Sequence, residues 1–318
     1  MTLSDIAVPS DGAELRRSLE AASPRYGEKA IKAFLFLCAA LSVATTTAIV
    51  LSLLLPAISF FQEVSILDFL TGTRWAPNFA DAHFGVLPIL VGSLMIVGFA
   101  LAVAIPVGLA SAIYLSEYAP QRVRKFIKPA LEMLAGIPTV AIGLWGFAFL
   151  IPLAQDVLPF LPWEGTFSSA VAGVAVGLLI VPLIASVSDD AMRAVPSDLR
   201  EGAYALGASK LKVSLRVVIP AAISGIVASI VLGMSRAVGE TMVVLMMAGA
   251  GTRDLTFNPW GSVQTITAYI GSTATGDIAT GTIQYDSIFA AGALLFVLTF
   301  AVNMVAIRLA RRFREVYE

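Results

Sequence analysis

The chain has 318 residues, of which 58% are hydrophobic and 14% are charged, and its formal net charge is −1. With a mean hydropathy of +0.85, it has too little polar surface for a soluble globule, and several apolar runs are long enough to cross a bilayer. We therefore expect an all-α, polytopic membrane protein.

The apolar runs predict six transmembrane helices. In chain order these are residues 31–60, 85–115, 129–153, 168–187, 220–248 and 287–307. Several exceed the roughly 20 residues that a perpendicular helix needs, so tilt, kinks or protruding ends are expected. Pro106, Pro138 and Pro182 lie inside these runs and are the predicted kink positions.

The distribution of lysine and arginine predicts the orientation. Basic residues precede the first run, follow the last, and fill the segments between runs two and three and between runs four and five: Arg16, Arg17, Arg25, Lys29, Lys32, Arg122, Arg124, Lys125, Lys128, Arg193, Arg200, Lys210, Lys212, Arg216, Arg308, Arg311, Arg312 and Arg314. The opposite side holds only Arg74 and Arg253. The positive-inside rule then makes both termini cytoplasmic.

This orientation divides the chain into three parts. Residues 1–30 and 308–318 are predicted cytoplasmic tails around a membrane domain of residues 31–307, with a cytoplasmic loop at 188–219 and a long external loop at 249–286. The N-terminal tail lacks the apolar core and cleavage site of a removable signal peptide. In the external loop, residues 265–270 are expected to form a short helix, and a loosely structured loop is as plausible as one that covers a pathway or meets a partner.

The sequence offers little material for metal or nucleophilic chemistry. His83 is the only histidine and Cys38 the only cysteine, so a metal cluster or an intrachain disulfide is not expected. There is no GxxxxGK[ST] phosphate loop, no HExxH and no GxSxG motif. We expect no catalytic residue, no bound metal and no cofactor on this chain, and any ATP-driven step would use ATP and magnesium on a separate subunit.

The segment EGAYALGASKLKVSLRVVIP, residues 201–220, has a distinctive spacing. Glu201, Gly202 and Ala203 are followed by Gly207, and nine residues later by an apolar triplet and a proline. Physically this predicts two short helices broken by a positive-φ glycine, with Ser197 or Asp198 capping the first and Ser209 the second. The pattern resembles the cytoplasmic loop of binding-protein-dependent ABC importer permeases, although Gly202 stands where that family has alanine. The resemblance implies a type I ABC importer permease architecture in which these four residues couple ATPase movement to the membrane helices.

Two charges lie in the fifth apolar run. Arg236 and Glu240 are spaced i, i+4, which places them on one helical face where they can pair. Ionised groups cost about 3 kcal/mol or more at the bilayer centre, so both are expected to face protein or water. They either neutralise each other and join helices, or present the guanidinium to a tetrahedral oxyanion while Glu240 holds it. Thr139, beside the Pro138 kink, is a further candidate for the same passage, with simple helix packing as the alternative.

Four longer segments narrow the resemblance. Residues 113–120, 131–147, 194–209 and 233–249 look like the permeases of the phosphate-specific ABC importer, and GLWGF with the long external loop looks like its C-type permease. The family implies a multi-pass protein of a prokaryotic plasma or inner membrane, in contact with membrane lipid and with no nucleic-acid partner. Its implied partners are a second homologous permease, two copies of an ATP-binding subunit and an extracytoplasmic phosphate-binding protein.

On this reading the protein moves inorganic phosphate into the cytoplasm by alternating access. One arginine does not distinguish phosphate from sulfate, molybdate or tungstate, so a permease for another oxyanion remains the nearest alternative. An ion-coupled secondary carrier with Glu240 as a proton site is a second alternative, and a membrane scaffold or sensor is a third.

Overall fold

The computed structural model describes residues 26–251 and 253–312, and the chain divides into two compact units, Met1–Ser52 and Leu53–Glu318. Most of the predicted tails lies outside the described residues. Helix α2 (Tyr26–Glu63) begins five residues before the predicted span, and α15 (Ile283–Arg312) continues beyond its end. By length and composition, five described helices can cross a membrane, or six if one bent helix pair forms a single span.

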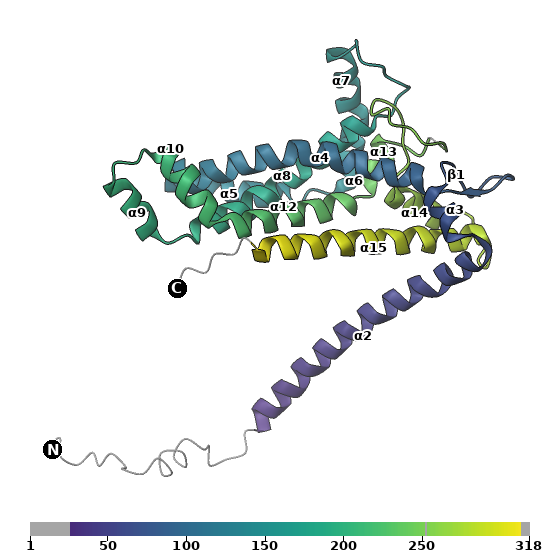
Figure 1. Ribbon diagram of the computed structural model, residues 1–318, viewed down its shortest axis with the longest axis horizontal. Helices are drawn as coiled ribbons and strands as arrows, with labels where there is room; N and C mark the ends of the chain where they lie inside the picture. The colour runs from purple at the N-terminus through teal and green to yellow at the C-terminus, as the bar shows by residue number, and fades with distance from the viewer. Residues whose placement is uncertain (1–25, 252, 313–318) are drawn as a thin grey trace. The chain divides into compact units, whose positions relative to one another are not determined.

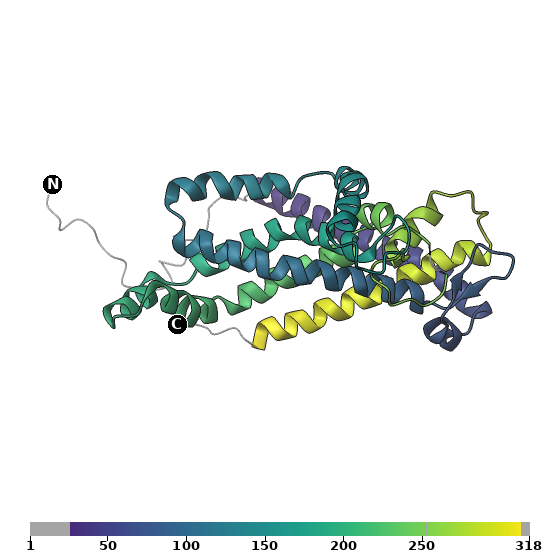
Figure 2. The ribbon, with the colours of Figure 1, turned by 90° about the horizontal axis from the view of Figure 1, so that it is seen from above.

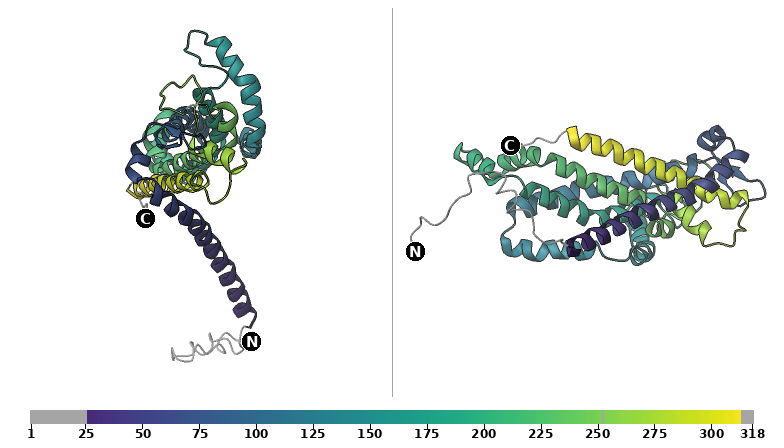
Figure 3. Two further views of the ribbon diagram at one scale, coloured as in Figure 1. Left: turned by 90° about the vertical axis from the view of Figure 1, so that its right-hand side faces the viewer. Right: turned by 90° about the horizontal axis from the view of Figure 1, so that it is seen from below.

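The core of the second unit is a packed set of long helices (Figure 1). α8 (Ser169–Arg193) packs against α4 (Leu87–Ile113) and α12 (Ile223–Val238). Glycines make the first contact close, since a Cβ on Gly177 would lie 2.7 Å from the Ala100 carbonyl oxygen. Figure 2 shows α4 and α8 running along each other, and the right-hand view in Figure 3 shows α15 lying beside α12.

One end of this unit is closed by a small mixed cluster. The last turns of α2 meet α3 (Ile66–Thr71), a two-residue antiparallel hairpin of β1 (Trp75–Ala76) and β2 (His83–Phe84), and α14 (Ile266–Ala274). Edge-to-face aromatic contacts hold it together, among them Phe60 with Phe69, and Trp75 with Tyr269 at 4.9 Å between ring centroids.

The long segment at 249–286 is more ordered than an open loop. The short helix expected at 265–270 is confirmed as α14, with Thr265 at its N-cap accepting a hydrogen bond from the Ala268 amide. Ile266 and Tyr269 are almost completely buried. The expectation of loose structure is therefore wrong, because α14 inserts apolar side chains into the bundle and the Ile266 amide donates to the buried Ser93 hydroxyl.

Two predicted spans are broken rather than continuous. The run 129–153 separates into α5 (Gln121–Leu134), α6 (Thr139–Trp145), η3 (Gly146–Leu150) and α7 (Ile151–Val157). The run 220–248 separates into α11 (Ile219–Ala221), α12 and α13 (Met242–Met247), and α11 meets α12 at a bend of 73°. Of the three prolines, only Pro138 lies at a break, whereas α4 and α8 continue through Pro106 and Pro182.

Because α4 and α8 lie so close together, we expect the stability of the protein to fall when a larger side chain is introduced at their contact. Gly177→Val should separate the helices and destabilise the protein by about 1–3 kcal/mol, as overpacking does. Gly98→Val on α4 is the matched control, because a Cβ there meets nothing within 4 Å. Thermal unfolding in detergent should show a clear fall in Tm for the first variant alone, and equal shifts would contradict this packing.

Candidate pathway and coupling loop

The predicted coupling loop forms a helical hairpin at one end of the second unit. α9 (Ser197–Ala205) is followed by a turn and then by α10 (Lys210–Val213) and η4 (Ser214–Val218). Gly207 has φ of +78°, which confirms the predicted left-handed stop. Glu201 and Gly202 are exposed, whereas Ala203 packs on the hydrophobic cluster beneath the hairpin.

The capping predictions were less successful. Pro196 is the N-cap of α9, and no side chain caps it, so the assignment of Ser197 or Asp198 was wrong. Both residues are already within the first turn, because Pro196 has the extended ψ that starts the helix. Ser209 is the N-cap residue of α10, as predicted, but its side chain makes no capping hydrogen bond.

The tip of the hairpin carries an exposed apolar residue that the motif did not single out. Leu206 is 89% exposed, directly before Gly207. A large aliphatic side chain presented so fully at a turn is suited to insert into a groove of another protein. In the sequence, the position of Leu206 directly before a glycine predicted to adopt positive φ was the signal that marked it as a residue at the tip of a turn.

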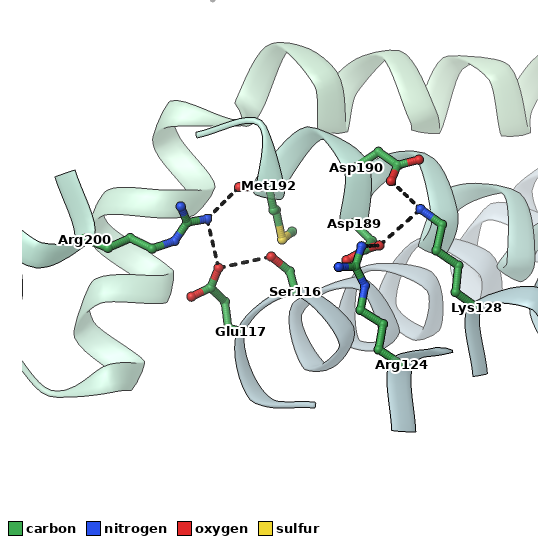
Figure 4. Close-up of polar contacts among 8 residues, drawn as sticks. All are labelled: Ser116, Glu117, Arg124, Lys128, Asp189, Asp190, Met192 and Arg200. Atoms are coloured by element: carbon green, nitrogen blue, oxygen red, sulfur yellow. Dashed lines mark hydrogen bonds and ion pairs between the residues drawn. The ribbon is translucent and has the colours of Figure 1, made fainter. Parts of the chain in front are cut away.

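Arg200 joins this hairpin to the membrane helices (Figure 4). Its guanidinium donates to the Met192 and Val195 carbonyls at 2.7 Å, at and just beyond the C-terminal end of α8. It also contacts the Glu117 carboxylate at 3.3 Å, and the Glu117 side chain is only 5% exposed. Glu117 belongs to η2 (Tyr114–Tyr118), which continues α4, so one arginine connects α9 with both central helices.

A second ionic cluster lies nearby, between α5 and α8 (Figure 4). The Asp189 side chain is fully buried and accepts from the Arg124 guanidinium at 2.7 Å and the Lys128 ammonium at 3.4 Å. Lys128 also pairs with Asp190, whose side chain is 62% exposed. The cluster ties α5, a helix without fully buried residues, to the bundle.

These clusters were not predicted because the span boundaries were misplaced. Ending the fourth run at residue 187 treated Asp189 as a loop residue, whereas α8 continues to Arg193 and carries it into the interior. Lys128 pairs with Asp189 and Asp190, which lie more than sixty residues away in the sequence. The i, i+4 spacing of Arg124 and Lys128 was the usable signal for a shared acidic partner.

Arg236 lies in the last turn of α12 and contacts the break in the third span. Its guanidinium makes a long hydrogen bond of 3.4 Å to the Ala135 carbonyl, at the C-terminal end of α5. The Ala135 carbonyl lies at the break between α5 and α6, where it has no helical partner. Among the described residues, the bond to this carbonyl is the only hydrogen bond of the Arg236 side chain, so most of the guanidinium donors are available to an anion.

Glu240 occupies the break in the fifth span. α12 ends at Val238, and the Glu240 carboxylate accepts from the Val243 amide at 3.2 Å, near the start of α13. Glu240 is 8% exposed, and its carbonyl accepts from the Thr267 hydroxyl of α14 at 2.7 Å. The suggested Arg236–Glu240 pair is absent from the described residues, because the helix that would align them stops between them.

Thr139 is the first residue of α6, immediately after the break at Pro138. α6 packs against α13, where a Cβ on Gly143 would lie 2.9 Å from the Met246 sulfur. The break in the third span therefore lies close to the break in the fifth span. Thr139 begins the helix that follows the first break, and Arg236 lies in the helix that precedes the second. No hydrogen bond joins their side chains within the described parts of the chain.

The described residues 26–251 and 253–312 contain no group of three His, Cys, Asp or Glu side chains able to hold a metal. The polar groups at the two breaks are the Arg236 guanidinium, the Glu240 carboxylate, backbone carbonyls at helix ends, and hydroxyl groups. Of these, the guanidinium and the hydroxyls can donate hydrogen bonds to an oxyanion, whereas the carbonyls and the carboxylate are acceptors.

The Lys128 ammonium stays charged over the physiological pH range. Burial lowers its pKa, but hydrogen bonds and charge attraction from Asp190 and Asp189 outweigh this and raise the pKa above its ordinary value of 10.5. A pKa raised by folding adds stability below the unfolded value and loses it as pH rises through the folded value. The contribution of the Lys128 charge to stability should therefore persist to strongly alkaline pH.

The buried cluster predicts unequal roles for two neighbouring aspartates. Asp189→Asn removes the buried counter-charge of Arg124 and should cost on the order of 3 kcal/mol. Asp190→Asn is the matched control, because an exposed pair contributes at most about 1 kcal/mol. Thermal unfolding in detergent measures both, and an equal loss of stability would contradict the role assigned to Asp189.

Comparisons with known proteins assign the chain to a family. Residues 104–315 match the family described as the inner membrane component of binding-protein-dependent transport systems. A probable ABC transporter permease protein of Bacillus subtilis, YqgH, is 35% identical over 266 residues, which cover 83% of this chain and 84% of the relative. The phosphate transport system permease protein PstC of Haemophilus influenzae is 35% identical over 250 residues, covering 73% and 77%.

Solved structures show the same fold at low sequence identity. A bacterial alginate ABC transporter has a TM-score of 0.62 at 15% identity, covering 93% of this chain and all of that chain. The inward-facing MetNI methionine ABC transporter has a TM-score of 0.52 at 18% identity, covering 73% and 95%. With the family match spanning most of the chain, the protein belongs to the inner membrane components of binding-protein-dependent transport systems.

Proposed function

We propose that this chain is the membrane-spanning permease subunit of an ATP-driven importer of inorganic phosphate. The observation that carries the proposal is Arg236, whose guanidinium sits where two broken spans meet and has donors left for an anion. Relatives from Haemophilus influenzae and Mycobacterium tuberculosis, named phosphate transport system permease proteins, are 35% and 33% identical over most of this chain.

The proposed assembly supplies what this chain lacks. A second homologous permease completes the passage, two ATP-binding subunits carry ATP and magnesium, and an extracytoplasmic phosphate-binding protein delivers the anion. Tight binding resides in that last protein, so a single arginine with a weak carbonyl contact suits a passage that has to release its cargo. The α9 end of the bundle, rich in Lys and Arg, faces the cytoplasm.

Transport proceeds by alternating access. Closure of the ATP-binding subunits moves the hairpin around Gly207, with Leu206 seated in their surface. Arg200 passes that movement to α8 and to the end of α4 through its contacts with Met192 and Glu117. The coupling works only if the hairpin binds the two nucleotide states differently, since equal affinity shifts no population.

The pathway charges give a direct test in cells. Arg236→Gln should lower phosphate uptake at least tenfold, because the amide cannot replace a charged fork for the oxyanion. Glu240→Gln keeps an oxygen that can cap α13 and removes only the charge, so a loss of uptake there assigns a role to the carboxylate beyond capping. Wild-type uptake of labelled phosphate in both variants would exclude these charges from the pathway.

The same assay separates the alternatives. Competition with unlabelled sulfate, molybdate or tungstate should leave phosphate uptake unchanged, whereas effective competition would favour another oxyanion. A secondary carrier would keep transporting without the ATP-binding subunits. Uptake that depends on those subunits is expected here and argues against the carrier.

The turn glycine of the hairpin gives a direct test of the coupling. Gly207→Val places a β-branched residue at φ of +78° and should distort the turn, and Gly165→Val is the matched control, because it creates the same strain at φ of +80° in a segment outside the hairpin. We expect Gly207→Val to reduce co-purification of the ATP-binding subunit and abolish uptake. If Gly207→Val retains both, the turn geometry does not matter for coupling.

A further inference from the structure

A polar pocket beside α5 has no role in the proposed pathway. It has a volume of about 430 Å³ and lies on the side of α5 that faces the end of α8. Its charged or amide-bearing lining residues are Gln121, Arg124, Lys125, Lys128, Glu132 and Arg193. Cationic side chains therefore outnumber anionic ones in a single cavity near the α9 end of the bundle.

The acidic side chains around this cavity do not neutralise it completely. The buried Asp189 and the exposed Asp190 pair with Arg124 and Lys128, and among the described residues Lys125 and Arg193 have no ion pair. Glu132 is the one carboxylate in the lining, so cations remain in excess. The Arg124 Nε–H is buried and has no hydrogen-bond partner in the described part of the chain. Unpaired cations and a buried unsatisfied donor are the features expected of an anion site.

Exposed apolar side chains lie on the same helix as the pocket. Phe126 is 78% exposed and Met133 is 71% exposed, and Pro129, which lines the pocket, lies between them at helical spacing. A basic pocket next to an exposed apolar stripe matches the two parts of an anionic phospholipid, its charged headgroup and its acyl chains. Basic pockets between membrane helices on the cytoplasmic side bind such headgroups.

We propose that the α5 pocket binds a phosphoryl oxyanion, supplied by the headgroup of an anionic phospholipid. Lys125 and Arg193 provide the charge, Gln121 provides an amide donor, and Phe126 and Met133 contact the acyl chains. Because the lipid lies against α5 beside the Asp189 cluster, it steadies the helix whose far end contacts Arg236. The inference rests on the proposed cytoplasmic placement of the α9 end, and not on the identity of the transported anion.

Lipid retention by the intact importer tests this site. The complex is purified in detergent, supplied with equal phosphatidylglycerol and phosphatidylcholine, and analysed by native mass spectrometry. Wild type should retain phosphatidylglycerol preferentially, and Lys125→Gln or Arg193→Gln should each weaken retention about fivefold, the factor for one basic contact of ~1 kcal/mol. Arg122→Gln is the matched control, since it removes an exposed cation from the same helix outside the pocket.

Competition with inorganic phosphate distinguishes a lipid headgroup from free phosphate as the group that occupies the pocket. Displacement of the lipid only at high phosphate concentration is expected for a headgroup site. Phosphate binding that depends on Lys125 and Arg193, without any preference for phosphatidylglycerol, would overturn the lipid assignment. Equal retention of both lipids together with no phosphate binding, or equal losses in all three variants, would overturn the site itself.

The cytoplasmic placement of the α9 end of the bundle is tested independently of the transport pathway. In a Cys38→Ser background, Lys212→Cys should react with a membrane-impermeant thiol reagent only from the cytoplasmic side. Labelling from outside would remove the premise for a cytoplasmic lipid headgroup. Because neither readout is phosphate uptake, failure of the lipid site is distinguishable from failure of the proposed transport function.

Discussion

An interrupted helix inside a bilayer must satisfy its free backbone groups within the protein, and this constraint organises the structure. Breaks in two spans leave the carbonyls of Ala135 and Glu240 without helical partners. Arg236 satisfies the first and Thr267 the second. Irregular backbone is tolerated at membrane depth only where protein or water surrounds it. The same breaks therefore bring polar groups together inside the protein, and α14 packs beside them and satisfies one of the free carbonyls.

At the opposite end of the bundle, the buried polar contacts are ion pairs instead of hydrogen bonds to free backbone carbonyls. Asp189 and Glu117 are buried acceptors, and their partners come from α5 and α9, the two elements least supported by apolar contacts. Breaking either pair would leave an uncompensated buried charge, which is more costly than the pair itself is stabilising. These contacts therefore fix the positions of α5 and α9, and they connect the α9–α10 hairpin to the central helices α4 and α8.

Composition and motif spacing were sufficient for the fold class, the number of apolar runs and the hairpin with its positive-φ turn at Gly207. They were insufficient wherever tertiary contacts decide the outcome. Hydropathy cannot distinguish a continuous helix from one broken after Leu134 or Val238, because both halves are apolar. For that reason the i, i+4 geometry inferred for Arg236 and Glu240 failed. Asp189 was overlooked because its burial depends on cations more than sixty residues away in the sequence, at Arg124 and Lys128.

The glycine-lined contact between α4 and α8 also has a mechanical consequence. Gly177 meets the Ala100 backbone, Gly233 of α12 meets Ile180, and a buried Ser188–Ser229 hydrogen bond joins α8 to α12. With so little space to slide, these three helices turn together as one stiff body. α8 has 25 residues, a length of about 37 Å, so a 10° rotation about one end displaces the other by about 6 Å. In the proposed coupling, a small movement of the hairpin passed on through Arg200 would be enlarged along α8 without any helix having to bend.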